Sequence, residues 1–270
     1  MRYIEYAPPN ELAEDVKCFW FFEHQFEAGE SHDESIVPDG CPELIFHIGT
    51  PYAEVNGQGS LTIQHSALLA GQITRPLALR ASKHASVLGV RLWPWGAHRY
   101  FALPLSETID ARIPLSTLCG ASIAVVLKNL QQADGDDKRI AVIADWLSTL
   151  PMVKARDQIV ISCARHLIAS QGQWRPETFA SAAMISTRQL ERRFKTCIGL
   201  TPKQLSSILR FRSLFDELQA DLPSAWLNAA IASGYFDQAH MIRDFKRYAG
   251  KPPQAYYGNM GHLSGALVAG

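Results

Sequence analysis

The sequence predicts an α+β fold in which an antiparallel β-rich domain, barrel- or sandwich-like, is followed by helices and then by an all-α domain. Three observations predict it. The first ninety residues place short apolar runs between Gly, Pro and polar residues, as strands and turns do. From Pro94 onward, apolar residues recur at spacings of three and four, the period of helices. Near the C-terminus, residues 234–253 repeat residues 183–202 at an offset of 51.

The N-terminal half is expected to form an antiparallel sheet, sandwich or barrel. The aromatic-rich stretch CFWFFEHQF at 18–26 is typical of a strand, and ALLAGQI, PLALRAS and ASVLGVRLW follow as further short segments. A Pro-Asp-Gly turn at 38–40 stands between two apolar runs, which indicates a hairpin. Helices are expected over about 94–150, so that a first domain covers residues 1–153 and a second covers 154–270.

Composition excludes several classes of protein. With 47% apolar and 19% charged residues, the chain has the balance of an ordinary globular protein rather than a disordered one. No apolar run approaches the roughly 18 residues of a membrane span, and the polar, acidic N-terminus predicts no signal peptide. The five cysteines are scattered and form no C-x-x-C pair, which indicates reduced thiols and a cytoplasmic location.

Charge is divided unevenly along the chain. Residues 1–153 hold 11 Lys and Arg against 18 Asp and Glu, whereas residues 154–270 hold 15 against 8. The second part, with a net charge of +7, is expected to be a basic module with a polyanionic partner. The first part, with a net charge of −7, is then an acidic module with another role.

Each copy of the repeat predicts a short helix, a tight turn and a second, basic helix, which together make a helix-turn-helix. In the first unit, about 176–198, Ser186 caps the second helix and Gln189 completes a capping box. In the second unit, about 224–249, Asp237 takes the role of the cap.

A linker helix over about 201–219 is expected between the two units, with Thr201 as its cap and Pro202 in its first turn. A helix of this length spans roughly 25 Å. Such a linker would hold the two basic helices about one duplex turn apart, roughly 34 Å, so that one chain reads two neighbouring stretches of major groove.

The outer faces of the two basic helices are expected to contact DNA. Leu190 and Phe194, like Met241 and Phe245, are four residues apart and predict the buried faces. The opposite faces hold side chains of the kind that hydrogen-bond base edges in a major groove. The base-reading candidates are Arg188, Glu191, Arg192, Gln238, Ala239, His240 and Arg243, and the phosphate-binding candidates are Lys195, Lys203, Arg210, Lys246 and Arg247.

The stretch from about 157 to 257 resembles the DNA-binding domain of the AraC/XylS family of bacterial transcription regulators. The resemblance is carried by ISTRQLERRFKTCIGLTPKQL in the first unit and GYFDQAHMIRDFKRYAGKPPQAYY in the second. It implies a sequence-specific activator or repressor whose base-reading residues are the seven candidates above. Two positions depart from the family pattern. Ala183 occupies the turn position of Gly234, and Glu191, where an uncharged polar residue is common, either accepts from cytosine or pairs with a neighbouring Arg.

The N-terminal half, through VPDGCPELIFHIG, GQITRPL and VLGVRLWPWGA, resembles the sensor half of a subset of these regulators. Sensor domains of the family commonly bind a small molecule, dimerise, or do both. The resemblance therefore implies double-stranded DNA, a small-molecule effector and a second copy of the chain as partners, with RNA polymerase added if the protein is an activator. No cofactor is expected. Trp20, Phe22, Trp93 and Trp95 are the candidates for lining a ligand pocket.

Neither catalysis nor metal binding is predicted. His24, His32, Asp33, Glu34, Glu43 and His47 suggest a metal site, but they contain no H-x-H pair, and the alternation around His47 places it on the outer face of a strand. Cys41 is expected to be a half-buried structural cysteine, with a reactive or alkyl-accepting thiol as the alternative. The alternative to a regulator is a ligand-binding β-domain, or an enzyme, whose helical tail mediates protein contacts. The two basic helices and the net charge of +7 favour the regulator.

Overall fold

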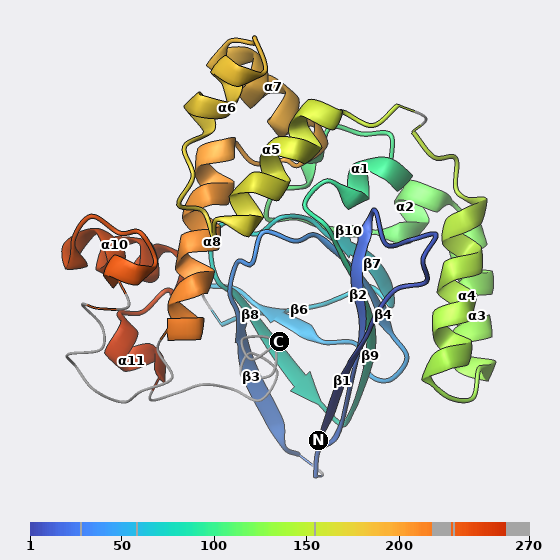
Figure 1. Ribbon diagram of the computed structural model, residues 1–270. Coiled ribbons are helices and arrows are strands. Elements are labelled where there is room, and N and C mark those ends of the chain that lie inside the picture. Colours follow the sequence, from blue (N-terminus) through green and yellow to red (C-terminus); the bar gives the residue numbers. More distant parts are fainter. Residues whose placement is uncertain (28, 58, 154, 218–227, 229, 258–270) are drawn as a thin grey trace.

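The computed structural model describes residues 1–27, 29–57, 59–153, 155–217, 228 and 230–257 (Figure 1). Its N-terminal part contains two antiparallel sheets with the strand orders β1-β2-β9-β4-β7-β10 and β3-β8-β5-β6. The first sheet consists of β1 (Arg2–Tyr6), β2 (Val16–Gln25), β9 (His84–Leu92), β4 (Glu43–His47), β7 (Ala67–Ala70) and β10 (Arg112–Pro114). The second consists of β3 (Ser31–Ile36), β8 (Leu77–Ser82), β5 (Ala53–Val55) and β6 (Leu61–Ile63). The predicted antiparallel β-rich architecture is confirmed.

The predicted hairpin at residues 38–40 is wrong. The strands on either side of the Pro-Asp-Gly turn lie in different sheets, because β3 pairs with β8 whereas β4 pairs with β7 and β9. Asp39 accepts from the backbone N–H of Cys41 at 2.9 Å, and the carbonyl of Gly40 accepts from Gln72 Nε2 at 2.7 Å. The turn therefore carries the chain from one sheet to the other, and Gln72 rather than a paired strand donates to its backbone.

Four α-helices and a 3₁₀ helix follow the strands and cover the outer face of the larger sheet (Figure 1). They are α1 (Gly96–Tyr100), η1 (Leu105–Thr108), α2 (Leu115–Cys119), α3 (Ser122–Gln132) and α4 (Asp136–Thr149). The apolar stretch 115–132 was expected to be helical, but the chain breaks at Gly120, which has a φ of 65°. The sequence did not predict β10, which is only three residues long and ends in a proline.

Strand β2 divides its aromatic side chains between two cores, as the period of two requires. Phe19 and Phe21 are buried in the core that the larger sheet shares with the helices, where Phe46 meets Trp146 edge-to-face at 5.9 Å. Trp20 and Phe22 point the other way, into the core between the two sheets. The aromatic-rich strand therefore stabilises both layers of the N-terminal part.

The C-terminal part consists, within the described residues, of α5 (Gln158–Ala169), α6 (Pro176–Ala182), α7 (Thr187–Cys197), α8 (Pro202–Glu217), α10 (Gln238–Ala249) and α11 (Pro253–Tyr257). Helix α8 contacts α5, α7 and α10, so it lies at the centre of this part (Figure 1). Thr201 caps α8 as predicted, since its hydroxyl accepts from the Gln204 N–H at 3.1 Å. The last predicted residues of the linker helix, 218 and 219, and residues 224–227 and 229 of the segment that opens the second unit lie outside the described residues.

The two parts of the chain share an interface. Val37 and Trp95 of the N-terminal part are buried in the same cluster as the helices of the C-terminal part. Asp15 pairs with Arg156 at 2.5 Å and Glu14 with Arg165 at 3.0 Å. We keep the domain boundary between residues 153 and 154 as a proposal, because the remaining core of each part comes from its own side of that position.

Candidate nucleic-acid interface and barrel cavity

Helix α7 is held by its cap and by its apolar face. The Ser186 side chain accepts from the Gln189 N–H, and the Gln189 side chain accepts from the Ser186 N–H at 2.8 Å, which confirms the predicted capping box. Leu190 and Phe194 are fully buried, and each contributes about 1.5–3 kcal/mol by this burial. Arg193 makes two hydrogen bonds of 2.6 Å to Asp157, the cap of α5, and so fixes α7 against α5.

Helix α10 is built in the same way. The Asp237 carboxylate accepts from the His240 N–H at 2.6 Å, which confirms the predicted cap. Met241 and Phe245 are buried on the inner face, as predicted. Both basic helices are followed by a glycine with positive φ, 92° at Gly199 and 73° at Gly250. The repeat thus extends from the caps to the ends of the two helices.

The side chains expected to read bases all lie on the outer faces of these helices. On α7 the exposed residues include Arg188, Glu191 and Arg192, which line a shallow depression together with Ser186, Gln189 and Lys195. On α10, Gln238, Ala239 and Arg243 are exposed, and His240 is half-exposed with its ring 3.8 Å from the Asp244 carboxylate. Their role in reading bases remains a prediction, but every one of the seven faces outward.

The turns of the two units differ by one residue, and this corrects the sequence alignment. The Ile185 N–H bonds to the Ala180 carbonyl, and the Tyr235 N–H bonds to the Ala230 carbonyl, so the offset before the caps is 50 rather than 51. The position equivalent to Gly234, with φ of 77°, is therefore Met184, with φ of 53°, whereas Ala183 has φ of −81°. The expectation that Ala183 replaces the turn glycine is wrong, because the second unit has one extra turn residue, Phe236.

Replacing Met184 with glycine should stabilise the protein. A non-glycine residue in the left-handed region costs about 1–2 kcal/mol, and the greater freedom of glycine in the unfolded chain offsets about 0.4–1 kcal/mol of that. The side chain is 92% exposed, so little packing is lost. We expect Met184→Gly to raise the free energy of urea-induced unfolding by about 0.5–1 kcal/mol. The neighbouring Ala183→Gly, at negative φ, should lower it, and a fall with both variants would contradict the assignment.

Four of the five phosphate-binding candidates are exposed: Lys195, Lys203, Lys246 and Arg247. The fifth, Arg210, is half-buried on α8 and donates to the Gly172 carbonyl and to Ser206 Oγ, each at 2.8 Å. Its guanidinium also lies 5.9 Å from the Tyr235 ring centre. These contacts give Arg210 a structural role, since it joins the loop after α5 to the turn of the second unit.

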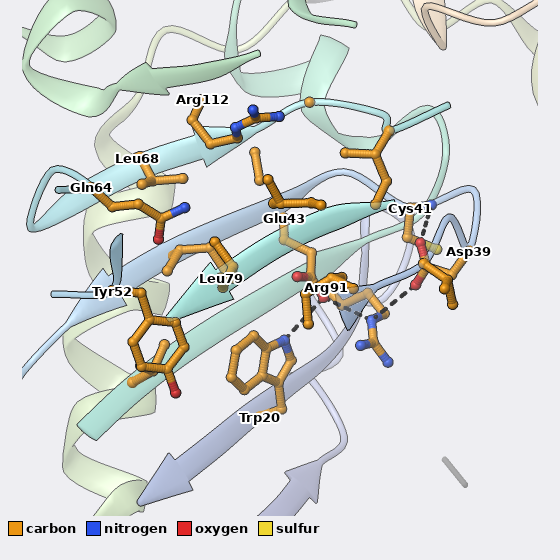
Figure 2. Close-up of a pocket in the computed structure, with 18 of the residues that line it drawn as sticks. Trp20, Asp39, Cys41, Glu43, Tyr52, Gln64, Leu68, Leu79, Arg91 and Arg112 are labelled. Atoms are coloured by element: carbon orange, nitrogen blue, oxygen red, sulfur yellow. Dashed lines mark hydrogen bonds and ion pairs between the residues drawn. The ribbon is translucent and has the colours of Figure 1, made fainter. Parts of the chain in front are cut away.

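A cavity of about 80 Å³ lies between the two sheets (Figure 2). Its wall is mostly apolar and includes Ile36, Ile45, Leu68, Leu79 and Val87. Arg212, from the linker helix α8, also lines it. The cavity of the N-terminal part is therefore bordered by the helix that joins the two helix-turn-helix units.

One end of the cavity holds a buried ionic cluster, shown at the right of Figure 2. Arg91 Nε lies 2.9 Å from Glu43 Oε1 and 3.4 Å from Asp39 Oδ2, while its Nη1 lies 3.3 Å from Glu5 Oε1. Trp20 Nε1 also donates to Glu43, at 3.1 Å. Burial raises the pKa of Glu43, although the Arg91 charge acts against this rise. The cluster places one buried cation among three partly exposed carboxylates.

Two family descriptions match the chain. Residues 179–259 match a helix-turn-helix domain, and residues 4–114 match a domain of unknown function (DUF6597). The first match contains α7, α8 and α10, the elements that hold the two capped, outward-facing basic helices. The C-terminal part therefore contains an AraC-type DNA-binding helix-turn-helix domain.

Solved structures similar to this chain have low sequence identity. ToxT from Vibrio cholerae is 10% identical, with a TM-score of 0.48 over 90% of this chain and 99% of ToxT. ToxT bound to (E)-4-(8-methylnaphthalen-1-yl)but-3-enoic acid is 10% identical, with a TM-score of 0.48 over 88% and 97% of the two chains. The AraC-like transcriptional activator CuxR is 14% identical, with a TM-score of 0.29 over 78% and 81%. No curated protein matches the sequence.

Of the four aromatic residues expected to line a pocket, Trp20 lines the cavity and the other three do not. Phe22 is buried in the core between the two sheets and does not reach the cavity. Trp93 and Trp95 follow the end of β9, stack on each other at 5.8 Å and belong to the interface with the C-terminal part. Cys41, also on the cavity wall, is half-buried as expected, and burial raises the pKa of its thiol.

The predicted position of His47 is wrong. His47 lies on the face of β4 that points away from the helices, and the second sheet covers that face. The His47 side chain is therefore only 3% exposed, and it lines the cavity. Across the part of the chain that the structure describes, no group of three or more His, Cys, Asp or Glu side chains could hold a metal ion. In that same part no helix is long and apolar enough to span a membrane.

Proposed function

We propose that the chain is a transcription regulator that reads two neighbouring segments of the DNA major groove, one with α7 and one with α10. The observation that carries the proposal is that two helices contact one linker helix, α8, and that each has a side-chain N-cap, the same spacing of buried residues and a basic outer face. An α-helix fits the major groove, and Arg and Gln are the side chains that best distinguish guanine and adenine there. Helix α8, with 16 residues, spans about 24 Å, which supports a separation near one duplex turn.

The N-terminal part is proposed to sense a small molecule, to pair two copies of the chain, or to do both. Its acidic charge would repel DNA phosphates, so it is not expected to add affinity by direct contact. The cavity between its sheets and the Arg212 side chain in the cavity wall support the sensing role. As a regulator the protein would act in the bacterial cytoplasm, with RNA polymerase as a further partner if it activates transcription.

The first experiment is selection of bound sequences from a random duplex pool with the full-length protein. We expect a site with two conserved segments about one helical turn apart. Affinity should fall linearly with salt on a log–log scale, because bound phosphates release counterions. A single short conserved segment would contradict the use of both helices, and no enrichment at low salt would contradict the proposal as a whole.

Arg243→Ala tests base reading against phosphate binding. On the selected site we expect a loss of about 1–3 kcal/mol, with preference relaxed at one base position. Lys203→Ala is the matched control, because this exposed residue opens the linker helix and is proposed to contact phosphate. It should weaken binding to all sequences alike and reduce the salt slope by about one. Equal losses on specific and random DNA for Arg243→Ala would exclude base reading by that residue.

A further inference from the structure

A chain of hydrogen bonds crosses the cavity wall and fixes the protonation of His47. Arg112 donates to both oxygens of Glu54 at 2.8 Å, and Gln64 Nε2 donates to Glu54 Oε1 at 3.0 Å. Because the amide nitrogen of Gln64 faces the carboxylate, its oxygen is the atom that meets His47 Nε2, at 3.0 Å. Nε2 must therefore hold the proton, and Nδ1 presents a lone pair.

Two buried polar atoms at the cavity have no hydrogen-bond partner among the described residues: His47 Nδ1 and the Tyr52 hydroxyl. Both side chains line the cavity, both are 3% exposed, and their ring centres lie 5.4 Å apart. His47 Nδ1 is an acceptor, and the Tyr52 hydroxyl can donate. Leaving a buried polar group unpaired costs about 1–3 kcal/mol, so such a pair at a cavity indicates a site for a ligand that completes the bonds.

The charges around the cavity favour an uncharged ligand. Of the three arginines on its wall, Arg91 is paired with three carboxylates and Arg112 with Glu54. The third, Arg212, is not free either, and its charge lowers the pKa of Tyr256. Burial lowers the pKa of His47 to about 4, so its ring adds no positive charge near neutral pH. A buried anion would meet the carboxylates of Asp39 and Glu43 without an unmatched cation.

The volume of the cavity limits the size of the ligand. A cavity needs about 10–15 Å³ to hold one water, so about 80 Å³ accommodates several waters or one small organic molecule. The wall beside the two polar atoms is apolar, with Leu79, Val87 and the Trp20 ring on it. Such a wall favours a ligand that is apolar apart from one group able to donate and accept.

We propose that the cavity between the sheets binds a small, uncharged, hydroxyl-bearing apolar molecule of the phenol class, whose hydroxyl donates to His47 Nδ1 and accepts from the Tyr52 hydroxyl. This ligand class rests on the proposed sensing role of the N-terminal part. Arg212 places the linker helix at the same cavity, so occupancy would change the environment of α8 directly.

The test is calorimetric and ligand-observed NMR titration of the full-length protein with phenol, benzene and benzoate. We expect phenol to bind at least about tenfold more tightly than either of the others. Tyr52→Phe should remove most of the preference for phenol over benzene and leave benzene binding unchanged, because it deletes one unpaired hydroxyl and no internal bond. Tyr235→Phe is the matched control, since its buried hydroxyl also has no partner among the described residues but lies in the DNA-binding part.

Tightest binding by benzoate would overturn the proposal in favour of an anion site, and equal binding of phenol and benzene would overturn the role of the two polar atoms. If the Tyr52→Phe variant kept the wild-type preference for phenol over benzene, the role of the two polar atoms would also be overturned. DNA affinity measured with and without phenol distinguishes this inference from the proposed function. Phenol binding with unaltered DNA affinity would support the ligand class while excluding the sensing role.

Discussion

Replacing Arg91 with methionine should lower the free energy of unfolding by about 3 kcal/mol, the lower end of the range for a broken buried ion pair, because it leaves partly exposed carboxylates without their buried cation. Arg91 is 4% exposed and lies within 3.4 Å of Glu5, Asp39 and Glu43. Burial alone would lower the pKa of Arg91, but the charges of Glu43 and Asp39 outweigh it and hold that pKa well above the ordinary value. Methionine keeps much of the side-chain volume, so the loss is mainly electrostatic.

Two further variants isolate the cause. Arg80→Met makes the same change at a partly exposed ion pair with Asp33 on the neighbouring sheet, where we expect no comparable loss. Glu43→Gln combined with Arg91→Met should recover part of the stability, since one uncompensated charge is removed. Urea unfolding followed by tryptophan fluorescence measures all three variants. A loss in Arg91→Met no larger than in Arg80→Met would exclude the buried cluster as a major contribution to stability.

Acidification should destabilise the protein through His47. Burial lowers the pKa of this imidazole to about 4 from an ordinary value of 6.5. Below about pH 6.5 the unfolded chain therefore binds a proton that the folded chain does not, and stability falls with pH until the folded imidazole also titrates near pH 4. Between about pH 7 and about pH 4.5, this single group should cost about 2–3 kcal/mol.

His47→Gln provides the comparison, because it removes the titrating ring and keeps a polar side chain. At neutral pH the His47→Gln variant should have a lower free energy of unfolding than the wild type. Between about pH 7 and about pH 4.5, however, the variant should lose about 2–3 kcal/mol less of that free energy than the wild type does. Unfolding free energies at the two pH values give the difference directly. Equal losses in both proteins would show that His47 titrates normally in the folded state.

The features that the sequence predicts best are local. A capping box is completed within four residues, and the apolar spacing of a helix is visible within two turns, so α7 and α10 could be predicted with their buried and exposed faces. The register of the repeat was predicted correctly only after the caps. Before them the offset is 50, because the extra residue Phe236 lies in a turn where no periodic pattern reveals an insertion.

The features that could not be predicted depend on which strands meet. The turn at 38–40 has the composition of a hairpin, but turn chemistry does not determine the partner of the next strand. His47 lies in an alternating strand whose outer face looks solvent-facing until a second sheet covers it. Tyr52, Gln64 and Glu54 come from segments with no distinctive motif, and they become a site only because β4, β5 and β10 are brought together across the cavity.

The turn that joins the two sheets has a consequence for building hybrid regulators. Gly40 approaches the linker helix so closely that a Cβ atom there would lie 2.9 Å from Leu205 Cδ1, while its neighbours Asp39 and Cys41 line the cavity. An N-terminal part exchanged between regulators would therefore have to bring a glycine at this turn together with an accommodating residue at position 205. Exchange at residue 153 alone would leave that contact unmatched, so compatible donors should be identifiable from this pair of positions before any hybrid is made.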